Sequence, residues 1–173
     1  MSTPETLETT TDAYFLEQLG PEIAPPPRPA RILVAEDDPA MLSLLVWSLH
    51  EEGYEVKEAR DGRELLRRLD LPFFEGHGLG GQDRYDLIVS DIRMPGYSGF
   101  EVLAALRARD AVTPVLLITA FGDQLTHYEA HSMGAAGVLD KPFDLEHFRA
   151  VVRRILSGGA PPPGPCQGRP RWP

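Results

Sequence analysis

The stretch from Tyr85 to Glu101 restricts the possible folds of this chain more than any other stretch does. Leu87-Ile88-Val89 is a short, wholly apolar run, which is typical of a strand buried on both faces of a parallel sheet. The run leads to a carboxylate, Asp91, and the breaker cluster Met94-Pro95-Gly96 then turns the chain back. The pattern therefore predicts a buried strand that delivers a carboxylate to its carboxyl end.

A helix is expected directly after this turn. Ser98 and Glu101 have the S-x-x-E spacing of a capping box, which predicts a helix that starts at Gly99. Open α/β folds place their ligand sites at the carboxyl ends of parallel strands, so Asp91 is the first candidate for chemistry. On this stretch alone, an aspartate that caps a helix or stabilises a turn explains the residue equally well.

The rest of the chain repeats this alternation of strand and helix. Further strands are expected at residues 31–35, 54–58, 113–119 and 137–140. Helices are expected from Pro39 to near Gly53, from Asp61 through Leu69, from Gly99, around 123–133, and after Asp144, which would cap the last one. Five strands that alternate with five helices predict an α/β fold with one doubly wound parallel sheet and right-handed crossovers.

Composition excludes several other classes of protein. No apolar run reaches the ~18 residues that a membrane span needs, and the N-terminus lacks the basic start and apolar core of a secretory signal. The formal charge of −9 argues against nucleic acid as the main partner, because phosphate binding needs a basic patch. The single cysteine, Cys166, excludes a disulfide framework. We therefore expect a cytoplasmic protein.

The chain divides into one domain and two tails. Residues 1–30 are rich in Thr, Glu and Pro and are expected to be a flexible tail, although Tyr14-Phe15-Leu16 could dock on a partner or on the domain. Residues 31–157 form the expected domain, and the Pro/Gly-rich residues 158–173 a second flexible tail. Residues 72–84 are expected to be an extended surface loop; they are not a phosphate-binding loop, because no Lys-Ser/Thr follows their glycines.

Four side chains have competing interpretations. Trp47 lies off the apolar stripe of the first predicted helix, and core packing is favoured over a partner contact. His77, alone in the glycine-rich loop, is expected to be solvated. His127 and His131 lie four residues apart and could bind a metal, but no third ligand is evident, which favours a solvated helix face.

Polar residues follow four of the five predicted strands. They are Glu36 and Asp37, then Asp91, then Thr119, and finally Lys141, and all are expected at one edge of the sheet. Crowded carboxylates repel one another unless a cation neutralises them, and an all-oxygen set suits Mg²⁺ better than zinc. A carboxylate beside Mg²⁺ and a lysine can attack a phosphoryl group, because the cations offset charge on the transferring oxygens.

Four segments, in this order, carry a resemblance to a known family: Ile-Leu-Val-Ala-Glu-Asp-Asp-Pro, Ile-Val-Ser-Asp-Ile-Arg-Met-Pro-Gly, Leu-Ile-Thr-Ala and Leu-Asp-Lys-Pro-Phe. As a set they make residues 31–157 resemble the CheY-like receiver domain of two-component response regulators. The resemblance implies a flavodoxin-like (βα)5 sheet with strand order 2-1-3-4-5.

The resemblance also implies roles for the acidic residues. Asp91 would accept a phosphoryl group from the phosphohistidine of a histidine kinase in a Mg²⁺-dependent step. Asp37 would bind Mg²⁺ directly, with Asp91 and the main-chain carbonyl of Arg93 as further ligands and Glu36 as a water-bridged neighbour.

Thr119 and Lys141 would contact the phosphoryl group, and Pro142 matches the family's cis-proline. Two departures from the family stand out. Val138 occupies a position that is commonly aromatic, which puts an aromatic switch in doubt but leaves open a Thr119-led shift of the helix at 123–133. The loop at 72–84 is longer than usual and is expected to serve packing or a partner, not catalysis.

The expected function is that of a stand-alone, phosphorylation-switched signalling protein, with no DNA-binding output domain after residue 157. It would not be a classical enzyme, although it would catalyse its own phosphorylation and slow autodephosphorylation. The expected partners are a sensor histidine kinase or phosphotransfer protein and a downstream protein. The face with Phe121, His127, Tyr128 and Val138 is the expected output surface and a candidate homodimer surface, although plain solvent exposure explains it nearly as well.

Two other functions compete with this one. The first is an unphosphorylated pseudo-receiver that acts as a docking module, and the complete set of site residues argues against it. The second is a phosphohydrolase with Asp91 as a turnover nucleophile. Such enzymes usually carry a second acid two residues on, where this chain has Arg93.

Overall fold

Five parallel strands form a single sheet. The computed structural model describes residues 28–70, 84–109 and 112–158. The strands are β1 (Arg31–Ala35), β2 (Glu55–Ala59), β3 (Leu87–Asp91), β4 (Val115–Thr119) and β5 (Gly137–Asp140). Their order is β2-β1-β3-β4-β5, with every neighbouring pair parallel, which confirms the predicted fold class and strand order.

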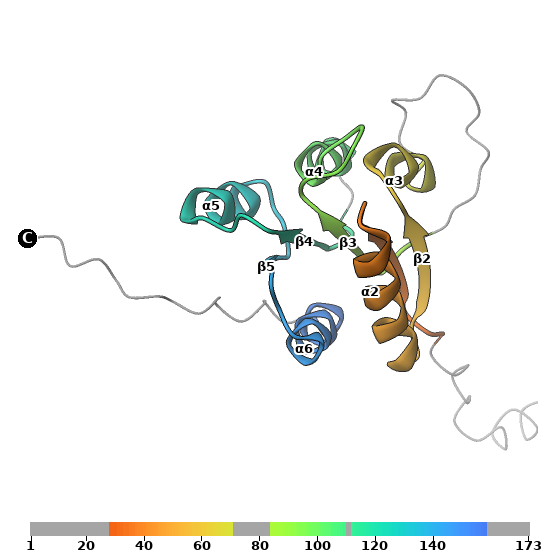
Figure 1. Cartoon of the computed structure of the whole chain (residues 1–173). Helices are drawn as coiled ribbons and strands as arrows, with labels where there is room; N and C mark the ends of the chain where they lie inside the picture. Colours follow the sequence, from red (N-terminus) through yellow and green to blue (C-terminus); the bar gives the residue numbers. More distant parts are fainter. Residues whose placement is uncertain (1–27, 71–83, 110–111, 159–173) are drawn as a thin grey trace, which may run out of the picture.

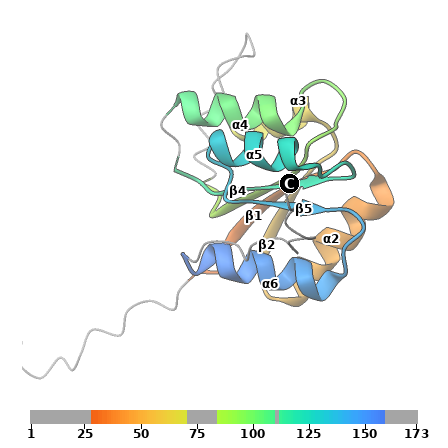
Figure 2. The ribbon, with the colours of Figure 1, turned by 90° about the vertical axis from the view of Figure 1, so that its left-hand side faces the viewer.

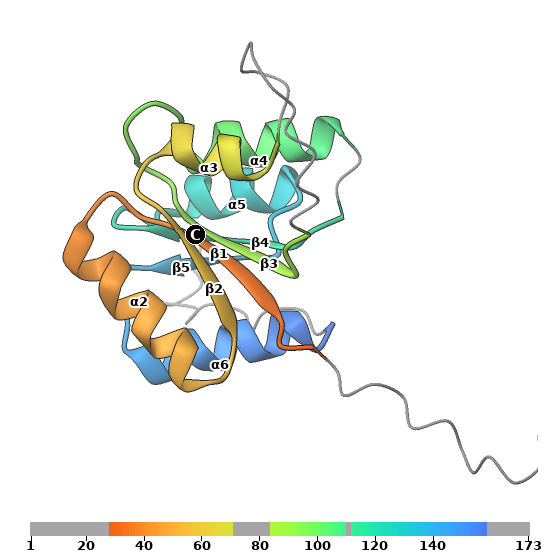
Figure 3. The same ribbon diagram turned by 90° about the vertical axis from the view of Figure 1, so that its right-hand side faces the viewer.

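Helices cover both faces of this sheet. They are α2 (Pro39–Glu51), α3 (Gly62–Arg68), α4 (Gly99–Ala108), α5 (Gln124–Ser132) and α6 (Leu145–Leu156). Figures 1 and 2 show α2 and α6 on one face and α3, α4 and α5 on the other, and the opposite view in Figure 3 shows the same three layers. This is the layered arrangement that right-handed crossovers between parallel strands produce.

Each helix starts at a side-chain cap. The N-terminal N–H groups of a helix have no partner within it, and a short polar side chain supplies the missing acceptor. The caps are Asp38, Asp61, Ser98, Asp123 and Asp144. The predicted capping box is present in full, with Ser98 and Glu101 each accepting a hydrogen bond from the other's backbone N–H. The helix starts are therefore set by local sequence.

Two strands begin later than predicted. β4 starts at Val115 and not at Thr113, because Pro114 has no N–H to give to the neighbouring strand. β2 starts at Glu55, since the N–H of Tyr54 still bonds to Leu49 at the end of α2.

The core consists of two apolar layers, one on each face of the sheet. Alternate strand residues point to opposite faces, so Ile32 and Val34 join one layer and Leu33 joins the other. The first layer is completed by α2 and α6, and the second by α3, α4 and α5. Every residue of β3 and β4 is buried. The central strands thus hold their carboxyl ends in fixed positions.

The outer face of α2 does not follow the prediction for Trp47. This side chain is 53% exposed, and its neighbour Leu44 is 42% exposed. Core packing of Trp47 was the favoured interpretation, and it is wrong. Leu42, Leu45 and Leu49 form the buried stripe of α2, so a residue off that stripe faces solvent. The guanidinium of Arg149 lies 5.8 Å from the centre of the Trp47 ring.

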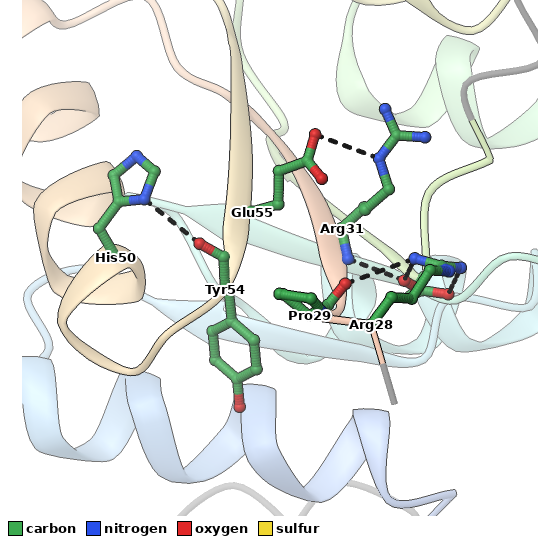
Figure 4. Close-up of polar contacts among 7 residues, drawn as sticks. Arg28, Pro29, Arg31, His50, Tyr54 and Glu55 are labelled. Carbon is green, nitrogen blue, oxygen red and sulfur yellow. Dashed lines mark hydrogen bonds and ion pairs between the residues drawn. The ribbon is translucent and has the colours of Figure 1, made fainter. Parts of the chain in front are cut away.

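An ionic cluster closes the amino edge of the sheet, opposite the predicted site (Figure 4). Arg28 donates two hydrogen bonds to Asp86, at 2.8 and 2.9 Å, and the backbone N–H of Arg31 donates a third at 2.7 Å. Burial acts to raise the pKa of Asp86, but these hydrogen bonds and the two arginine charges outweigh it and hold the pKa below its ordinary value. The cost of burying the charge of Asp86 is thus offset by its hydrogen bonds and by the two arginines.

Several sequence predictions lie outside the described residues. They concern residues 1–27, almost all of the loop at 72–84 with His77, and residues 159–173 with Cys166. Among the helices that the structure describes, none has the length and apolar character required to cross a membrane.

Candidate functional site

The carboxyl edge of the sheet gathers all five polar residues that the sequence singled out. Glu36 and Asp37 follow β1, Asp91 ends β3, Thr119 ends β4 and Lys141 follows β5. Glu36, Asp91 and Thr119 are 1%, 7% and 2% exposed, whereas Asp37 is open to solvent. Buried polar side chains from three strand ends therefore meet there, together with the partly buried Lys141 and the exposed Asp37.

Three of these residues form an acidic cluster. Glu36, Asp37 and Asp91 each offer a carboxylate oxygen, and these oxygens lie within 4.8 Å of one another. No other group of three potential metal ligands occurs in the described ranges. Hard oxygen donors at this spacing, two of them buried, fit Mg²⁺, which prefers carboxylates and retains water ligands.

The ammonium of Lys141 neutralises part of the negative charge of the acidic cluster. Its Nζ lies 2.7 Å from Glu36 Oε2 and 3.6 Å from Asp91 Oδ2. The Lys141–Pro142 peptide is cis, as the resemblance predicted for Pro142. One ammonium is thus shared between two buried carboxylates, with the shorter contact to Glu36.

The ammonium of Lys141 does not fully neutralise the two buried carboxylates. Burial raises the pKa of Asp91; Lys141 and the backbone N–H of Arg93 act against this rise, whereas the charge of Asp37 adds to it. The pKa of Glu36 is likewise raised, chiefly by burial, with Lys141 acting against it and Asp91 adding to it. Such a cluster favours any additional positive charge.

Thr119 connects the ends of β4 and β5. Its hydroxyl accepts a hydrogen bond from the backbone N–H of Phe121 at 3.1 Å. Its carbonyl accepts one from the backbone N–H of Lys141 at 2.7 Å. The two residues that would contact a group on Asp91 are therefore joined through the backbone.

Backbone contacts fix the site on the side of α3. The N–H of Gly62 donates to the carbonyl of Pro95 at 3.1 Å, and a Cβ on Gly62 would overlap the backbone of Tyr97. A Cβ on Gly99 would come within 2.6 Å of the carbonyl oxygen of Asp91. Only glycine allows these approaches, so the segment that follows Asp91 is held on this side by main chain.

The side of α5 is different, since side chains make the contacts there. The guanidinium of Arg93 lies 4.3 Å from the centre of the Phe121 ring. Phe121, in the segment before α5, and Leu125 and Tyr128, on α5, are 62%, 71% and 72% exposed, and these three side chains are called the apolar strip below. The sequence analysis named Phe121 and Tyr128 but missed Leu125, which lies three residues before Tyr128 on the same helix.

His127 reaches from α5 to the end of β5. Its Nε2 lies 2.8 Å from Asp140 Oδ1 and donates a hydrogen bond to this carboxylate. The same carboxylate fills the space that a Cβ on Gly122 would occupy. A metal site at His127 and His131 gains no support, because His127 pairs with Asp140 and the described residues supply no third ligand. This contact was missed from sequence.

A sheet of this order, with carboxylates, a threonine and a lysine at its carboxyl edge, defines the class of receiver domains in two-component signalling. The model of the response regulator receiver domain matches residues 32–153. The chain therefore belongs to this family.

Curated relatives agree with this assignment. The transcriptional regulatory protein TcrA of Mycobacterium tuberculosis is 39% identical over 135 residues, which are 78% of this chain and 49% of TcrA. The response regulator MprA of Mycolicibacterium vanbaalenii is 37% identical over 136 residues, or 79% of this chain and 54% of MprA. The chain spans about half the length of these two relatives.

Solved structures give the same result. The chemotaxis response regulator CheY4 of Vibrio cholerae is 31% identical and superimposes with a TM-score of 0.63, covering 73% of this chain and 98% of CheY4. The receiver domain of the Francisella response regulator 1452 is 26% identical with a TM-score of 0.66, covering 75% of this chain and 98% of that domain.

Proposed function

We propose that Asp91 accepts a phosphoryl group from the phosphohistidine of a sensor histidine kinase or a phosphotransfer protein in the cytoplasm. The observation that carries this proposal is the position of Asp91, a buried carboxylate within an acidic cluster and 3.6 Å from an ammonium. A purely structural carboxylate would be fully compensated, as Asp86 is.

Each site residue has a definite part in the transfer. A carboxylate oxygen of Asp91 forms a bond to phosphorus as the bond between phosphorus and the imidazole nitrogen of the donor breaks. A Mg²⁺ bound to Asp37, Asp91 and the main-chain carbonyl of Arg93, with Glu36 through water, would neutralise charge on the transferring oxygens. The ammonium of Lys141 and the hydroxyl of Thr119 supply hydrogen bonds to the same oxygens.

The phosphoryl group is lost slowly and without a dedicated acid. Water attacks phosphorus, and the carboxylate of Asp91 is the leaving group. A turnover phosphohydrolase would require a further acid or base near this bond, and Arg93 stands two residues after Asp91. The protein thus acts as a timed switch and not as a classical enzyme.

The phosphorylated domain signals through protein contacts and does not itself bind nucleic acid. The exposed strip Phe121–Leu125–Tyr128, flanked by His127 and Val138, supports a surface for a downstream protein or a second copy on α5 and β5. The formal charge of −9 supports a protein partner over nucleic acid. Onward relay of the phosphoryl group to a further protein is part of this proposal.

The test is phosphorylation of the purified protein by acetyl phosphate and Mg²⁺, followed by intact mass spectrometry. We expect one added phosphoryl group in the wild type and none in Asp91→Asn. Asp86→Asn is the matched control, since it changes a carboxylate at the other end of the same strand and should still be phosphorylated. A folded wild type that stays unmodified would contradict the proposal and favour the alternative of a pseudo-receiver that acts as a docking module.

A further inference from the structure

Helix α5 is weakly attached to the domain. Only Ala130 of its nine residues is buried, whereas α6 buries Phe148, Val151, Val152 and Ile155. Leu125 and Tyr128 project outward, so apolar packing does little for the half of α5 nearest the site. In that half, the side-chain contact that reaches the sheet is the hydrogen bond from His127 to Asp140.

This contact ends one residue from the site. Asp140 is the last residue of β5, and Lys141 comes next. The backbone N–H of Lys141 bonds to the carbonyl of Thr119, whose hydroxyl accepts from Phe121 in the segment that leads into α5. A displacement of Lys141 or Thr119 toward Asp91 therefore changes the position of Asp140 relative to His127.

Phosphorylation requires such a displacement. Lys141 Nζ now lies closer to Glu36 than to Asp91, and the Thr119 hydroxyl accepts a hydrogen bond from its own loop. A phosphoryl group on Asp91 brings oxygens that need donors. Lys141 Nζ, 3.6 Å from Asp91 Oδ2, and the hydroxyl of Thr119, which ends the neighbouring strand, can supply them. Under the proposed function, Lys141 therefore moves from Glu36 toward the new group, and Thr119 donates its O–H to it.

We infer that the His127–Asp140 contact is a latch that holds the site end of α5 in its unphosphorylated position and opposes the movement of Lys141 and Thr119. The inference rests on the proposed function of Asp91. His127 and Asp140 are positioning residues here, because they act through Lys141 and α5 and do not touch the phosphoryl group. Opening the latch releases α5 and its exposed residues Leu125 and Tyr128.

Gly122 provides a way to open the latch without removing either partner. The Asp140 carboxylate fills the space of a Cβ at position 122, and this carboxylate is the movable end of a side chain. Gly122→Ala should therefore push Asp140 away from His127 and leave both residues in place. His127→Leu opens the latch from the other side, because leucine has no N–H to donate to Asp140.

The experiment is a calorimetric titration of the full chain with beryllofluoride and Mg²⁺, which together mimic the phosphoryl group. Gly122→Ala and His127→Leu should each bind the mimic roughly two- to fivefold more tightly than wild type, the range expected for one exposed polar contact. The double variant should bind no more tightly than either single one, because both open the same latch. His131→Leu, four residues on along α5 and exposed, is the matched control and should bind like wild type.

The outcomes separate the latch from other roles. A merely structural contact would lower the melting temperature and leave binding unchanged or weaker, and that result in both variants overturns the inference while the proposed function stands. Hydrogen exchange gives an independent readout. In wild type the amides of α5 should lose protection on addition of the mimic, and in Gly122→Ala they should already be less protected without it. A wild type that is folded but does not bind the mimic overturns the proposed function, and the latch with it.

Discussion

Asp86 and Asp91 flank the same strand and have opposite electrostatic surroundings. Asp86, just before β3, accepts hydrogen bonds from Arg28 and from the backbone of Arg31, and its pKa lies below the ordinary value of 3.8. Asp91, at the other end of β3, is more deeply buried and shares one ammonium with Glu36, so its pKa lies above that value. At the amino edge of the sheet, hydrogen bonds and arginine charges balance the carboxylate of Asp86. At the carboxyl edge, too little positive charge surrounds the carboxylates.

This difference separates stability from function. A carboxylate that contributes to stability attracts enough donors to favour its ionised form, whereas a carboxylate that must bind a cation and a phosphoryl group is left short of them. The shortage of positive charge around such a carboxylate lowers the stability of the free protein. Binding of a cation removes this destabilisation.

The largest expected effect on stability comes from removing the ammonium of Lys141 at the carboxyl edge. Lys141→Met leaves Glu36, which is 1% exposed, without its cationic partner. We expect the free energy of unfolding at pH 7 to fall by about 3 kcal/mol, because a buried carboxylate is left unpaired. Urea unfolding measures this change. Arg28→Met at the amino edge is the control, and an equal loss in both variants would contradict the comparison.

The second effect has the opposite sign. Asp91→Asn removes one of the crowded carboxylates, and we expect a gain in stability of about 1–2 kcal/mol at neutral pH. The raised pKa sets the pH dependence: folding favours protonated Asp91, so its ionisation at neutral pH costs stability, and this cost fades as pH falls through the folded pKa toward the unfolded value of 3.8. The advantage of Asp91→Asn should therefore shrink between pH 7 and pH 4, and a constant advantage over this range would contradict the assignment.

The third effect concerns Asp86→Asn, which should destabilise the protein by about 1 kcal/mol through the loss of charge-assisted hydrogen bonds. The pKa of Asp86 is lowered, so its contribution is present above 3.8 and is lost only as pH falls through the lower folded pKa. The loss of unfolding free energy in Asp86→Asn should thus stay constant from pH 7 to pH 5, whereas the gain in Asp91→Asn should shrink. Thermal unfolding across this range compares the two variants directly.

The smallest effect is expected for Arg28→Met. This arginine is largely exposed, and an exposed ion pair contributes about 0.5 kcal/mol. The loss should disappear at high salt, because salt screens exposed charges, whereas the loss in Lys141→Met should persist. Urea unfolding at about 1 M NaCl, where the screening length falls to about 3 Å, tests this difference.

Local signals in the sequence were sufficient for the alternation of strands and helices and for the residues at the carboxyl edge of the sheet. The order of the strands was implied only by the resemblance to receiver domains. A buried strand, its final polar residue and the cap that follows are adjacent in the chain, as at Leu87–Asp91 and Ser98. Contacts between distant residues have no such signal. The hydrogen bonds from Arg28 to Asp86 join residues 58 positions apart. Arg28 lies in a proline-rich stretch where a flexible tail was expected.

The latch and Trp47 were missed for a related reason. His127 and Asp140 lie on different elements, and their contact depends on how closely α5 approaches β5. Core packing was favoured for Trp47 because of its residue type, yet its position off the Leu42–Leu45–Leu49 stripe already indicated exposure. Periodicity was the better guide than side-chain type.

The glycine contacts around Asp91 have a mechanical consequence. On the side of α3, main chain touches main chain at Gly62 and Tyr97, which makes the site stiff in that direction. On the side of α5, the boundary at Gly122 is the carboxylate of Asp140, a side chain that can rotate, so the site is compliant there. Under the proposed function, strain from a phosphoryl group on Asp91 would therefore relax more readily toward α5 than toward α3.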